Sequence, residues 1–473
     1  METYNNLSKI QEDISKGLLS CEMLVNHYLQ VIDEKKHLNA FLEVYAEEAL
    51  TAAKNIDEKI KNKTQGRLAG MVLSLKDNLC LKGHLVGAAS KILEGFESLY
   101  TATAVQRLLD EDAIVIGRVN CDEFAMGASN ENSAYGNVLN DADNSRVPGG
   151  SSGGAAVSVQ AGMCLAALGT DTGGSIRQPA SFCGLVGYKP TYGAVSRHGL
   201  LAYASSFDQI GPLTKKVEDT ALITSIMSGE DSFDATLSSK GKFSFEKKAS
   251  RNLKIAYMKD CLEHEALDSE VKETTFDLIE KLKSDGHVVE GVEFPFIDYM
   301  VPCYYVLTTA EASSNLSRYS GLMYGYRSEN AIDLESTFKK SRSEGFGEEV
   351  QRRIMLGTFV LSSDHYDAYY TKAQKVRNLI QIKTQEILED YDLIVLPTTS
   401  TPAFEIGEKS KDPIAMYLAD LFTVQANLAG NPAISVPIGH HKKENLPFGI
   451  QVIGKKYEEN NLLNFAMELE KEK

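Results

Sequence analysis

The sequence has no tryptophan and no apolar run near the roughly 20 residues that a helix needs to cross a membrane. Its first residues, Met1–Ile14, are polar and acidic, and they lack the apolar core of a secretion signal. We therefore expect a cytoplasmic protein with no membrane segment.

Cysteine and histidine are present, but neither is grouped in a ligand pattern. The seven cysteines are scattered, and no two of them form a C-x-x-C pair. Disulfide and zinc frameworks are therefore not expected, and most thiols should be buried as small apolar groups. The nine histidines are equally dispersed, so His198 and His365 are expected to be structural or exposed.

Positive charge is scarce, with 49 lysines and arginines against 65 aspartates and glutamates, a net charge of −16. An acidic surface repels phosphate, so this chain should not be the main contact for a nucleic acid. The glycines at 149–154 are not followed by Lys-Ser or Lys-Thr, which excludes a P-loop for nucleotide phosphates.

Three segments carry residues that could do chemistry together. Lys76 ends a short apolar run, and Ser151 lies in the glycine-rich segment 148–154. Ser175 lies in a second glycine-containing segment, 169–177. A hydroxyl needs a base to become a nucleophile, and a buried lysine can serve because burial lowers its pKa. A second serine could carry the proton between them, and glycines let backbone N–H groups approach a developing oxyanion.

The first of these glycine segments also satisfies the G-x-S-x-G pattern of a nucleophile elbow, with Ser152 as the nucleophile. That turn needs an apolar strand directly before it. Residues 140–147 are polar, so the elbow interpretation fails in its own context.

Expected strands and helices alternate along the chain, which is typical of an α/β fold. Strands are expected at 71–75, 113–117, 163–168, 253–258, 287–292, 393–396, 433–437 and 449–453. Helices are expected at 20–32, 46–61, 103–110, 153–160, 268–285 and 461–471. No linker or repeat divides the chain, so we expect one domain over 1–473, beginning with a helical segment at about 1–65.

Three polar segments are expected to be irregular. Residues 120–143 should form a loop region of the active site, and 232–251 a surface loop or insertion. The charged segment Glu335–Gly347 is expected to be a mobile loop near the mouth of the site. Ile176 should open a short helix, which would place Ser175 where the positive end of the helix dipole favours an oxyanion.

The two glycine-serine segments and the Lys-Asp-Asn segment at 76–78 resemble the amidase signature family of Ser-Ser-Lys amide hydrolases. Further segments resemble the branch of that family that hydrolyses glutamine for tRNA-dependent amidotransferases. They are 182–184, 187–193, 205–212, 311–316, 352–357 and 426–433. The resemblance runs from about Leu19 to Leu469, and it implies a large mixed sheet covered by helices on both faces.

The resemblance implies a role for each residue of a catalytic triad. Ser175 would attack the side-chain amide of glutamine, Ser151 would relay the proton, and Lys76 would be the base. The peptide bond before Ser151 would be cis. The oxyanion hole would be formed by backbone N–H groups, those of Thr172, Gly173, Gly174 and Ser175.

The resemblance also implies groups that recognise the head of glutamine. A guanidinium suits its α-carboxylate and an acid suits its α-ammonium group. These groups would be Arg353 and Asp420, with Tyr304 nearby, while the adjacent Arg352 and Tyr305 remain alternatives. Supporting contacts are expected from Ser152, Asp171 and Arg177.

No cofactor or metal is expected in this chain. The resemblance implies a larger B subunit that holds the tRNA and uses ATP and magnesium, and a small C subunit. Glutamyl-tRNA(Gln) would be the acceptor of ammonia, with aspartyl-tRNA(Asn) as a possible second acceptor.

Two other hypotheses differ in class. A stand-alone amidase acting on small amides would keep the triad without needing Arg353 or Asp420. A non-catalytic scaffold of the same fold would lack at least one triad residue, but the sequence contains all three.

Overall fold

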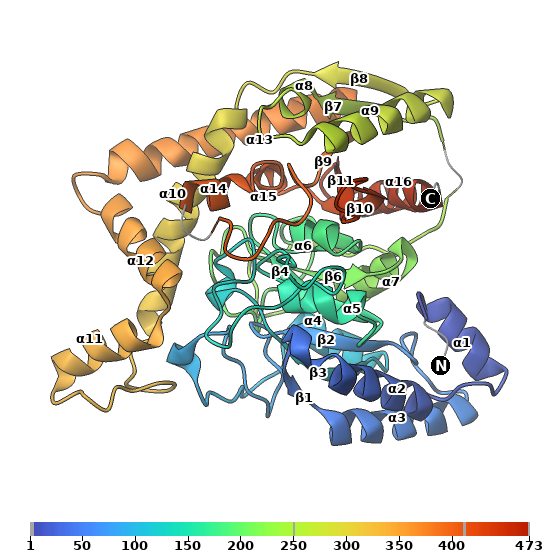
Figure 1. Cartoon of the computed structure of the whole chain (residues 1–473), viewed down its shortest axis with the longest axis horizontal. Helices are drawn as coiled ribbons and strands as arrows, with labels where there is room; N and C mark the ends of the chain where they lie inside the picture. Colours follow the sequence, from blue (N-terminus) through green and yellow to red (C-terminus); the bar gives the residue numbers. More distant parts are fainter. Residues whose placement is uncertain (1–3, 249–250, 410–412, 472–473) are drawn as a thin grey trace.

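In the part of the chain that the structure describes, eleven strands form one mixed sheet (Figure 1). The structure is a computed structural model that describes residues 4–248, 251–409 and 413–471. The strand order is β1-β3-β2-β4-β6-β5-β10-β11-β9-β7-β8. The strands are β1 (Phe41–Val44), β2 (Val72–Lys76), β3 (Ile114–Val119), β4 (Ala166–Asp171), β5 (Val186–Lys189), β6 (Gln209–Thr214), β7 (Lys254–Met258), β8 (Val288–Val292), β9 (Leu393–Pro397), β10 (Ala433–His440) and β11 (Pro447–Gly454).

Parallel and antiparallel pairing occupy different parts of the sheet. Strands β3, β2 and β4 pair in parallel, as do β9, β7 and β8. From β4 through β6, β5, β10 and β11 to β9, every pair is antiparallel. Parallel strands need crossover connections, and helices supply these at both flanks of the sheet.

Helices cover both faces of the sheet. Successive residues of a strand point to opposite faces of the sheet. Gln451 and Gly454 are three residues apart in β11, so they face opposite sides of the sheet. Gln451 contacts Arg177 of one helix, whereas Gly454 packs against Leu462 of another. The helices are α1 (Leu7–Ser15), α2 (Cys21–Glu34), α3 (Ala46–Lys61), α4 (Thr103–Asp110), α5 (Gly153–Gln160), α6 (Arg177–Phe182), α7 (Val217–Met227), α8 (Lys259–Leu262), α9 (Ser269–Ser284), α10 (Ile297–Asn315), α11 (Leu334–Gly345), α12 (Glu348–Val360), α13 (Lys372–Asp390), α14 (Pro413–Leu418), α15 (Val424–Ala429) and α16 (Glu459–Lys471).

Most of the elements expected from periodicity are confirmed. They are β2, β3, β7 to β11, α2 to α5, α9 and α16. The strand expected at 163–168 begins later, at Ala166, and continues to Asp171. Residues 120–143 are irregular except for a short 3-10 helix, Glu123–Ala125. In the described part of 232–251, the only helix is the 3-10 helix Ser239–Gly241, while 249–250 lie outside the described residues.

The expectation of a mobile loop at Glu335–Gly347 is wrong. Residues Leu334–Gly345 form helix α11, and Asp333 and Ser336 form a capping box at its start. The Asp333 carboxylate accepts from the Ser336 amide at 2.7 Å, and the Ser336 hydroxyl accepts from the Asp333 amide at 3.0 Å. Such reciprocal bonds satisfy amides that a helix start leaves without partners. The high charge of this segment belongs to an exposed helix, which projects beside α12 in Figure 1.

All seven cysteines are free and buried, as expected for small apolar side chains. None of the described helices combines the length and apolar character needed to cross a lipid bilayer. The prediction of one domain stays a prediction, and the continuity of the sheet supports it.

Candidate active site

Lys76 is the last residue of β2 and is completely buried. Its Nζ lies 2.7 Å from Ser151 Oγ, 2.9 Å from Ser152 Oγ and 2.9 Å from Thr170 Oγ1. Strand pairing explains the last contact, because β2 and β4 lie side by side in parallel and Thr170 is near the end of β4. The amine of Lys76 therefore meets three hydroxyls.

Burial lowers the pKa of Lys76 to about 8, because a charged amine loses its hydration there. The contacts also indicate where a neutral amine would direct its hydrogens. Ser152 Oγ donates to the Thr170 carbonyl at 3.1 Å, so it can only accept from Lys76. Thr170 Oγ1 also accepts from Asn78 at 3.0 Å. With its two N–H bonds aimed at Ser152 and Thr170, the neutral amine would direct its lone pair to Ser151.

The loop that carries Ser151 is held from both sides. The Gly150–Ser151 peptide bond is cis. The Gly150 amide donates to Gln178 Oε1 at 2.9 Å, and Gln178 Nε2 donates to the Ala128 carbonyl at 2.6 Å. A Cβ on Gly150 would lie 2.0 Å from Asp122 Oδ2, so no side chain fits at this position.

Ser175 lies between β4 and α6, directly before Ile176, the N-cap residue of α6. It is the most exposed member of the triad at 8%, whereas Lys76 and Ser151 are fully buried. The Ser175 carbonyl accepts from the Ser152 amide at 3.2 Å, which joins the two serine segments. Of the three residues, only Ser175 therefore keeps any solvent exposure.

The segment before Ser175 offers backbone donors. Among the described residues, no hydrogen-bond acceptor pairs with the backbone N–H groups of Thr172, Gly173 and Ser175. The Gly174 amide differs from the expectation, because it donates to Asp171 Oδ1 at 2.9 Å. Gly174 instead supplies a conformation with φ of +134°, which side chains rarely adopt.

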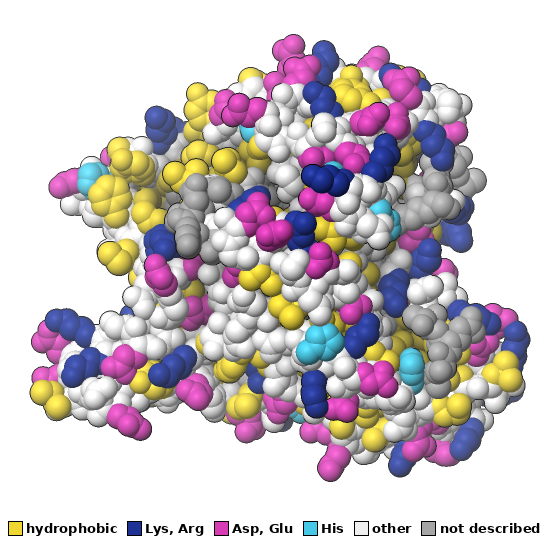
Figure 2. All heavy atoms as spheres, in the orientation of Figure 1, with side chains coloured by type: hydrophobic (Ala, Val, Ile, Leu, Met, Phe, Trp, Pro, Cys, Tyr) yellow, Lys and Arg dark blue, Asp and Glu magenta, His cyan; other side chains and the backbone are white. Residues whose placement is uncertain are grey.

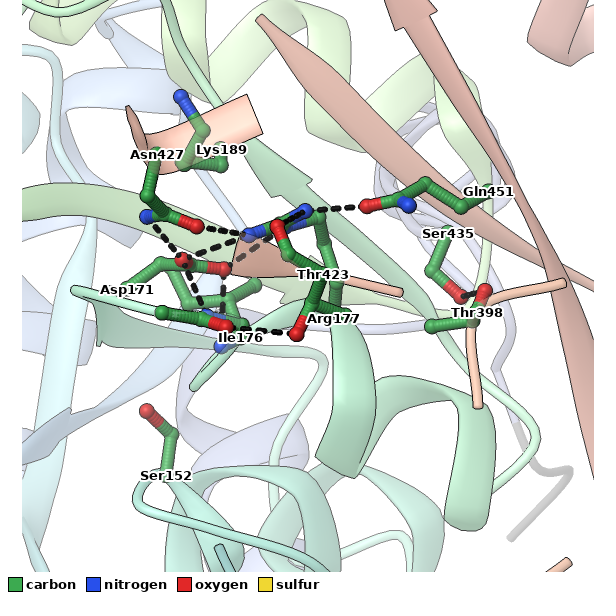
Figure 3. Close-up of polar contacts among 12 residues, drawn as sticks. Ser152, Asp171, Ile176, Arg177, Lys189, Thr398, Thr423, Asn427, Ser435 and Gln451 are labelled. Atoms are coloured by element: carbon green, nitrogen blue, oxygen red, sulfur yellow. Dashed lines mark hydrogen bonds and ion pairs between the residues drawn. The ribbon is translucent and has the colours of Figure 1, made fainter. Parts of the chain in front are cut away.

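Asp171 and Arg177 form an ion pair in which both side chains are fully buried (Figure 3). Arg177 Nε donates to Asp171 Oδ2 at 2.9 Å, and its NH2 group donates to Oδ1 at 3.0 Å. Arg177 also donates to the Thr423 carbonyl, to Asn427 Oδ1 and to Gln451 Oε1. The pair therefore ties the Ser175 loop to α15 and β11.

Burial alone would raise the pKa of Asp171, but the charge of Arg177 and its hydrogen bonds outweigh this and lower it to about 2. The ionised Asp171 therefore stabilises the folded protein. This contribution is fully present above the unfolded pKa of roughly 3.9, and it is lost as the pH falls toward the folded pKa. Asp171 is therefore a carboxylate throughout the physiological range.

Two of the groups expected to bind the head of an amino acid are linked to Gly173 in the loop before Ser175, Tyr304 by packing and Asp420 through the Thr423 hydroxyl. Tyr304 of α10 lies against the loop, since a Cβ on Gly173 would be 2.5 Å from its hydroxyl oxygen. Tyr305 points its hydroxyl to Asp420 Oδ2 at 2.9 Å. Burial raises the pKa of Asp420 to about 7, with the Tyr305 hydrogen bond and the charge of Arg353 opposing the shift.

Arg353 and Arg352 of α12 have different environments. The Arg353 side chain is 3% exposed, and it donates to Glu349 Oε1 at 2.8 Å and to the Tyr203 hydroxyl at 2.8 Å. The Arg352 side chain is 37% exposed and pairs with Glu348 and Glu349. A cavity of about 120 Å³ is lined by both Arg352 and Arg353, so it does not separate the two arginines. Burial and the hydrogen bond to Tyr203 therefore distinguish Arg353 from Arg352.

Several contact residues were not anticipated as part of the site. They are Gln178, Asp208, Thr170, Glu349, Thr423, Asn427 and Gln451. Asp208 and Asn427 fall within segments 205–212 and 426–433, so the sequence did indicate their neighbourhoods. Within 4–248, 251–409 and 413–471, no group of three His, Cys, Asp or Glu residues could hold a metal ion.

Comparison with known proteins gives consistent results. The Amidase family model matches residues 23–463. A relative from Chlorobium phaeobacteroides, the A subunit of its glutamyl-tRNA(Gln) amidotransferase, is 48% identical over 98% of each chain. The crystal structure of the corresponding A subunit from Thermotoga maritima has a TM-score of 0.77 and 41% identity, covering 95% of this chain and 92% of that one. Peptide amidase from Stenotrophomonas maltophilia has a TM-score of 0.78 and 26% identity, covering 98% and 96%.

Replacing Arg177 with Met should strongly destabilise the fold, because it leaves the Asp171 carboxylate buried without its partner. Breaking a buried pair in this way costs about 3–5 kcal/mol. The matched control is Arg67→Met, since Arg67 is 57% exposed and pairs with Glu111 at the surface. Such exposed pairs contribute roughly 0–1 kcal/mol. Denaturant unfolding should show the large loss only for Arg177→Met, and equal losses would contradict this account.

Proposed function

Because the chain belongs to the amidase family, we propose that it hydrolyses glutamine as the A subunit of a glutamyl-tRNA(Gln) amidotransferase. One observation carries this assignment. The buried Lys76–Ser151 pair lies beside the segment of Ser175. Buried Arg353 and Asp420 both contact Tyr305, whose neighbour Tyr304 packs against Gly173 of that segment. The first pair suits amide hydrolysis, and the second suits the charged head of glutamine.

In the proposed reaction, Ser175 Oγ attacks the side-chain amide carbon of glutamine. Its proton passes to Ser151 Oγ, and the Ser151 proton passes to the lone pair of Lys76. The amides of Thr172, Gly173 and Ser175 would stabilise the oxyanion of the tetrahedral intermediate. When the C–N bond breaks, the proton returns through Ser151 to the leaving nitrogen. Ammonia departs and a glutamyl ester of Ser175 remains.

Water completes the cycle by the same route. It attacks the ester carbonyl while Ser151 and Lys76 take up its proton. The bond from carbonyl carbon to Ser175 Oγ breaks, the proton returns to that oxygen, and glutamate leaves. Lys76 thus alternates between its neutral and charged forms, which its lowered pKa makes accessible.

The head of glutamine would be held by Arg353 and Asp420. The guanidinium can donate to the α-carboxylate, and the Asp420 carboxylate can accept from the α-ammonium group. Tyr304 would close the site over Gly173, where its hydroxyl already lies. Ser152, Asp171 and Arg177 would act by fixing the positions of the triad and its loop.

Partner subunits would complete the reaction in the cytoplasm. We assign tRNA binding and the use of ATP and magnesium to a larger B subunit, and a small C subunit would bind this chain. The face in Figure 2 supports this division, because lysines and arginines are scattered among acidic side chains. Ammonia would pass to the larger subunit to convert glutamyl-tRNA(Gln) to glutaminyl-tRNA(Gln).

Glutamine hydrolysis should rise with pH and level off above about 8, where Lys76 becomes neutral. Protonation of Asp420, whose pKa is about 7, should add a second loss in acid by weakening glutamine binding. The measurement is kcat/KM for ammonia release from glutamine across this range. Asp420→Asn should remove the second loss and keep the first. A profile with no limb near 8 would contradict the role of Lys76.

The central experiment combines this chain with its candidate partners and glutamyl-tRNA(Gln). With glutamine as donor, Ser175→Ala should abolish glutaminyl-tRNA(Gln) formation, and free ammonia should restore it. Ser363→Ala is the matched control, because Ser363 is exposed and lies in the turn that follows α12. If glutamine supports no conversion while small amides are still cleaved in a Ser175-dependent way, the chain is a stand-alone amidase.

Arg353→Lys should raise the KM for glutamine about tenfold or more, because lysine keeps the charge but loses the planar fork that grips a carboxylate. The matched change Arg352→Lys should alter KM by less than about twofold, since Arg352 pairs at the surface. Steady-state ammonia release measures both variants. A larger effect at Arg352 would reverse the assignment.

A further inference from the structure

Asp208 lies opposite the loop that precedes Ser175, and the sheet dictates this placement. Strands β4 and β6 are antiparallel, with Asp171 opposite Gln209 as the last pair of the ladder. One step further along both chains, Thr172 and Asp208 face each other. The Thr172 hydroxyl donates to Asp208 Oδ1 at 2.7 Å. The ladder is thus extended by a side-chain bond into the segment that carries the free amides.

The Asp208 carboxylate is buried and accepts three hydrogen bonds. Its second oxygen, Oδ2, accepts from the amides of Tyr203 and Ala204 at 3.0 and 3.1 Å. These bonds close the turn formed by residues 203–208. A buried carboxylate with three donors holds its position firmly, because each lost bond would leave it poorly solvated.

The 203–208 turn also contacts the residues assigned to the head of glutamine. The Tyr203 hydroxyl accepts from Arg353 NH1 at 2.8 Å. The Phe207 ring packs edge-on against Tyr304, with ring centroids 5.8 Å apart. Three residues of this one turn therefore make the contacts. Asp208 binds Thr172 of the oxyanion segment (residues 172–175), Tyr203 binds Arg353, and Phe207 packs against Tyr304.

We infer that Asp208 is a positioning residue that fixes the oxyanion segment relative to the Arg353 anchor. This inference rests on the proposed glutaminase function. Thr172 is the point of contact with the oxyanion segment, and its own amide is one of the three free donors. Tyr203 is the point of contact with the anchor. One oxygen of the Asp208 carboxylate binds Thr172 and the other binds the Tyr203 amide. The distance between the oxyanion segment and Arg353 therefore depends on Asp208.

The two contacts can be separated experimentally. Thr172→Val removes only the hydroxyl and keeps the shape, so it should lower kcat for glutamine about tenfold or more with KM changed less than about twofold. Thr172→Ser keeps the hydroxyl and should recover most of kcat. Tyr203→Phe should instead raise KM for glutamine and leave kcat nearly unchanged. Asp208→Asn should change both constants, because it disturbs both contacts.

A matched control is Thr224→Val in α7, since Thr224 is also buried and its hydroxyl donates to the Thr220 carbonyl away from the site. It should leave both constants unchanged. Thermal unfolding of each variant identifies any that fail to fold. If Asp208→Asn fails to fold, the comparison of Thr172→Val with Thr172→Ser still tests the inference. Unchanged kcat in Thr172→Val, or a Thr172→Ser variant as impaired as Thr172→Val, would overturn the inference.

The outcome is distinguishable from failure of the proposed function. If wild-type protein with its partners releases no ammonia from glutamine, the glutaminase assignment fails. The Thr172 variants are then compared on a small aliphatic amide such as butyramide. If kcat of Thr172→Val on that amide is about tenfold lower, the role of the Thr172–Asp208 contact is supported and the coupling to Arg353 is refuted. If wild-type protein hydrolyses glutamine and the Thr172 substitutions do not change kcat, the inference is refuted and the proposed function stands.

Discussion

The ion pair between Asp171 and Arg177 is the constraint on which the rest of the site depends. Both side chains are fully buried, so each charge is stable only with the other in place. Asp171 ends β4 and Arg177 begins α6, so the pair spans the turn that contains Ser175. Its further bonds to α15 and β11 fix that turn against the opposite end of the chain. Ser175 is thus placed by electrostatics rather than by a regular element.

The surroundings of Lys76 follow a different rule. Its three closest partners are neutral hydroxyls, and no carboxylate within the described residues forms a salt bridge with it. A carboxylate in contact would hold the amine charged, because opposite charges favour each other's ionised form. Hydroxyls accept its hydrogens without that penalty. The acids near Lys76 have other partners: Asp171 pairs with Arg177, Asp208 accepts from Thr172, and Asp122 accepts from the amides of Asn130 and Asn132.

The sequence predicts those parts of the molecule whose signals are local. The strand before Lys76, the small-residue helix after Ser152 and the amphipathic helix α9 are each recognisable within a few residues. Helix α10 is not, because it is buried around most of its circumference and shows no single apolar stripe. Helix α11 contradicts the loop expected there, because the capping box of Asp333 and Ser336 begins a helix in a segment whose high charge is typical of a loop.

The site residues divide in the same way. Glycine and serine segments identify Ser151 and Ser175, since their chemistry requires those residue types close together in sequence. Asp208 could not be found so easily, because its partner Thr172 lies 36 residues away in the sequence. Glu349 lies four residues before Arg353, so the i,i+4 spacing of a helix could have indicated that pair. Only the pairing of β4 with β6 brings Thr172 opposite Asp208. Likewise, nothing local distinguishes Arg353 from Arg352; burial of one face of α12 does.

The environment of Arg353 stabilises a buried charge while leaving some of its N–H groups without a hydrogen-bond partner among the described residues. The guanidinium lies 5.1 to 5.7 Å from the ring centroids of Tyr203, Tyr305 and Tyr417, and Glu349 balances its charge. Its desolvation is therefore incurred on folding and not on binding. Glu349 and Tyr203 engage Nε and one hydrogen of NH1, which leaves the remaining N–H groups for a carboxylate. A rigid, partly satisfied guanidinium selects ligands by geometry, because only an anion that reaches its open edge gains the remaining hydrogen bonds.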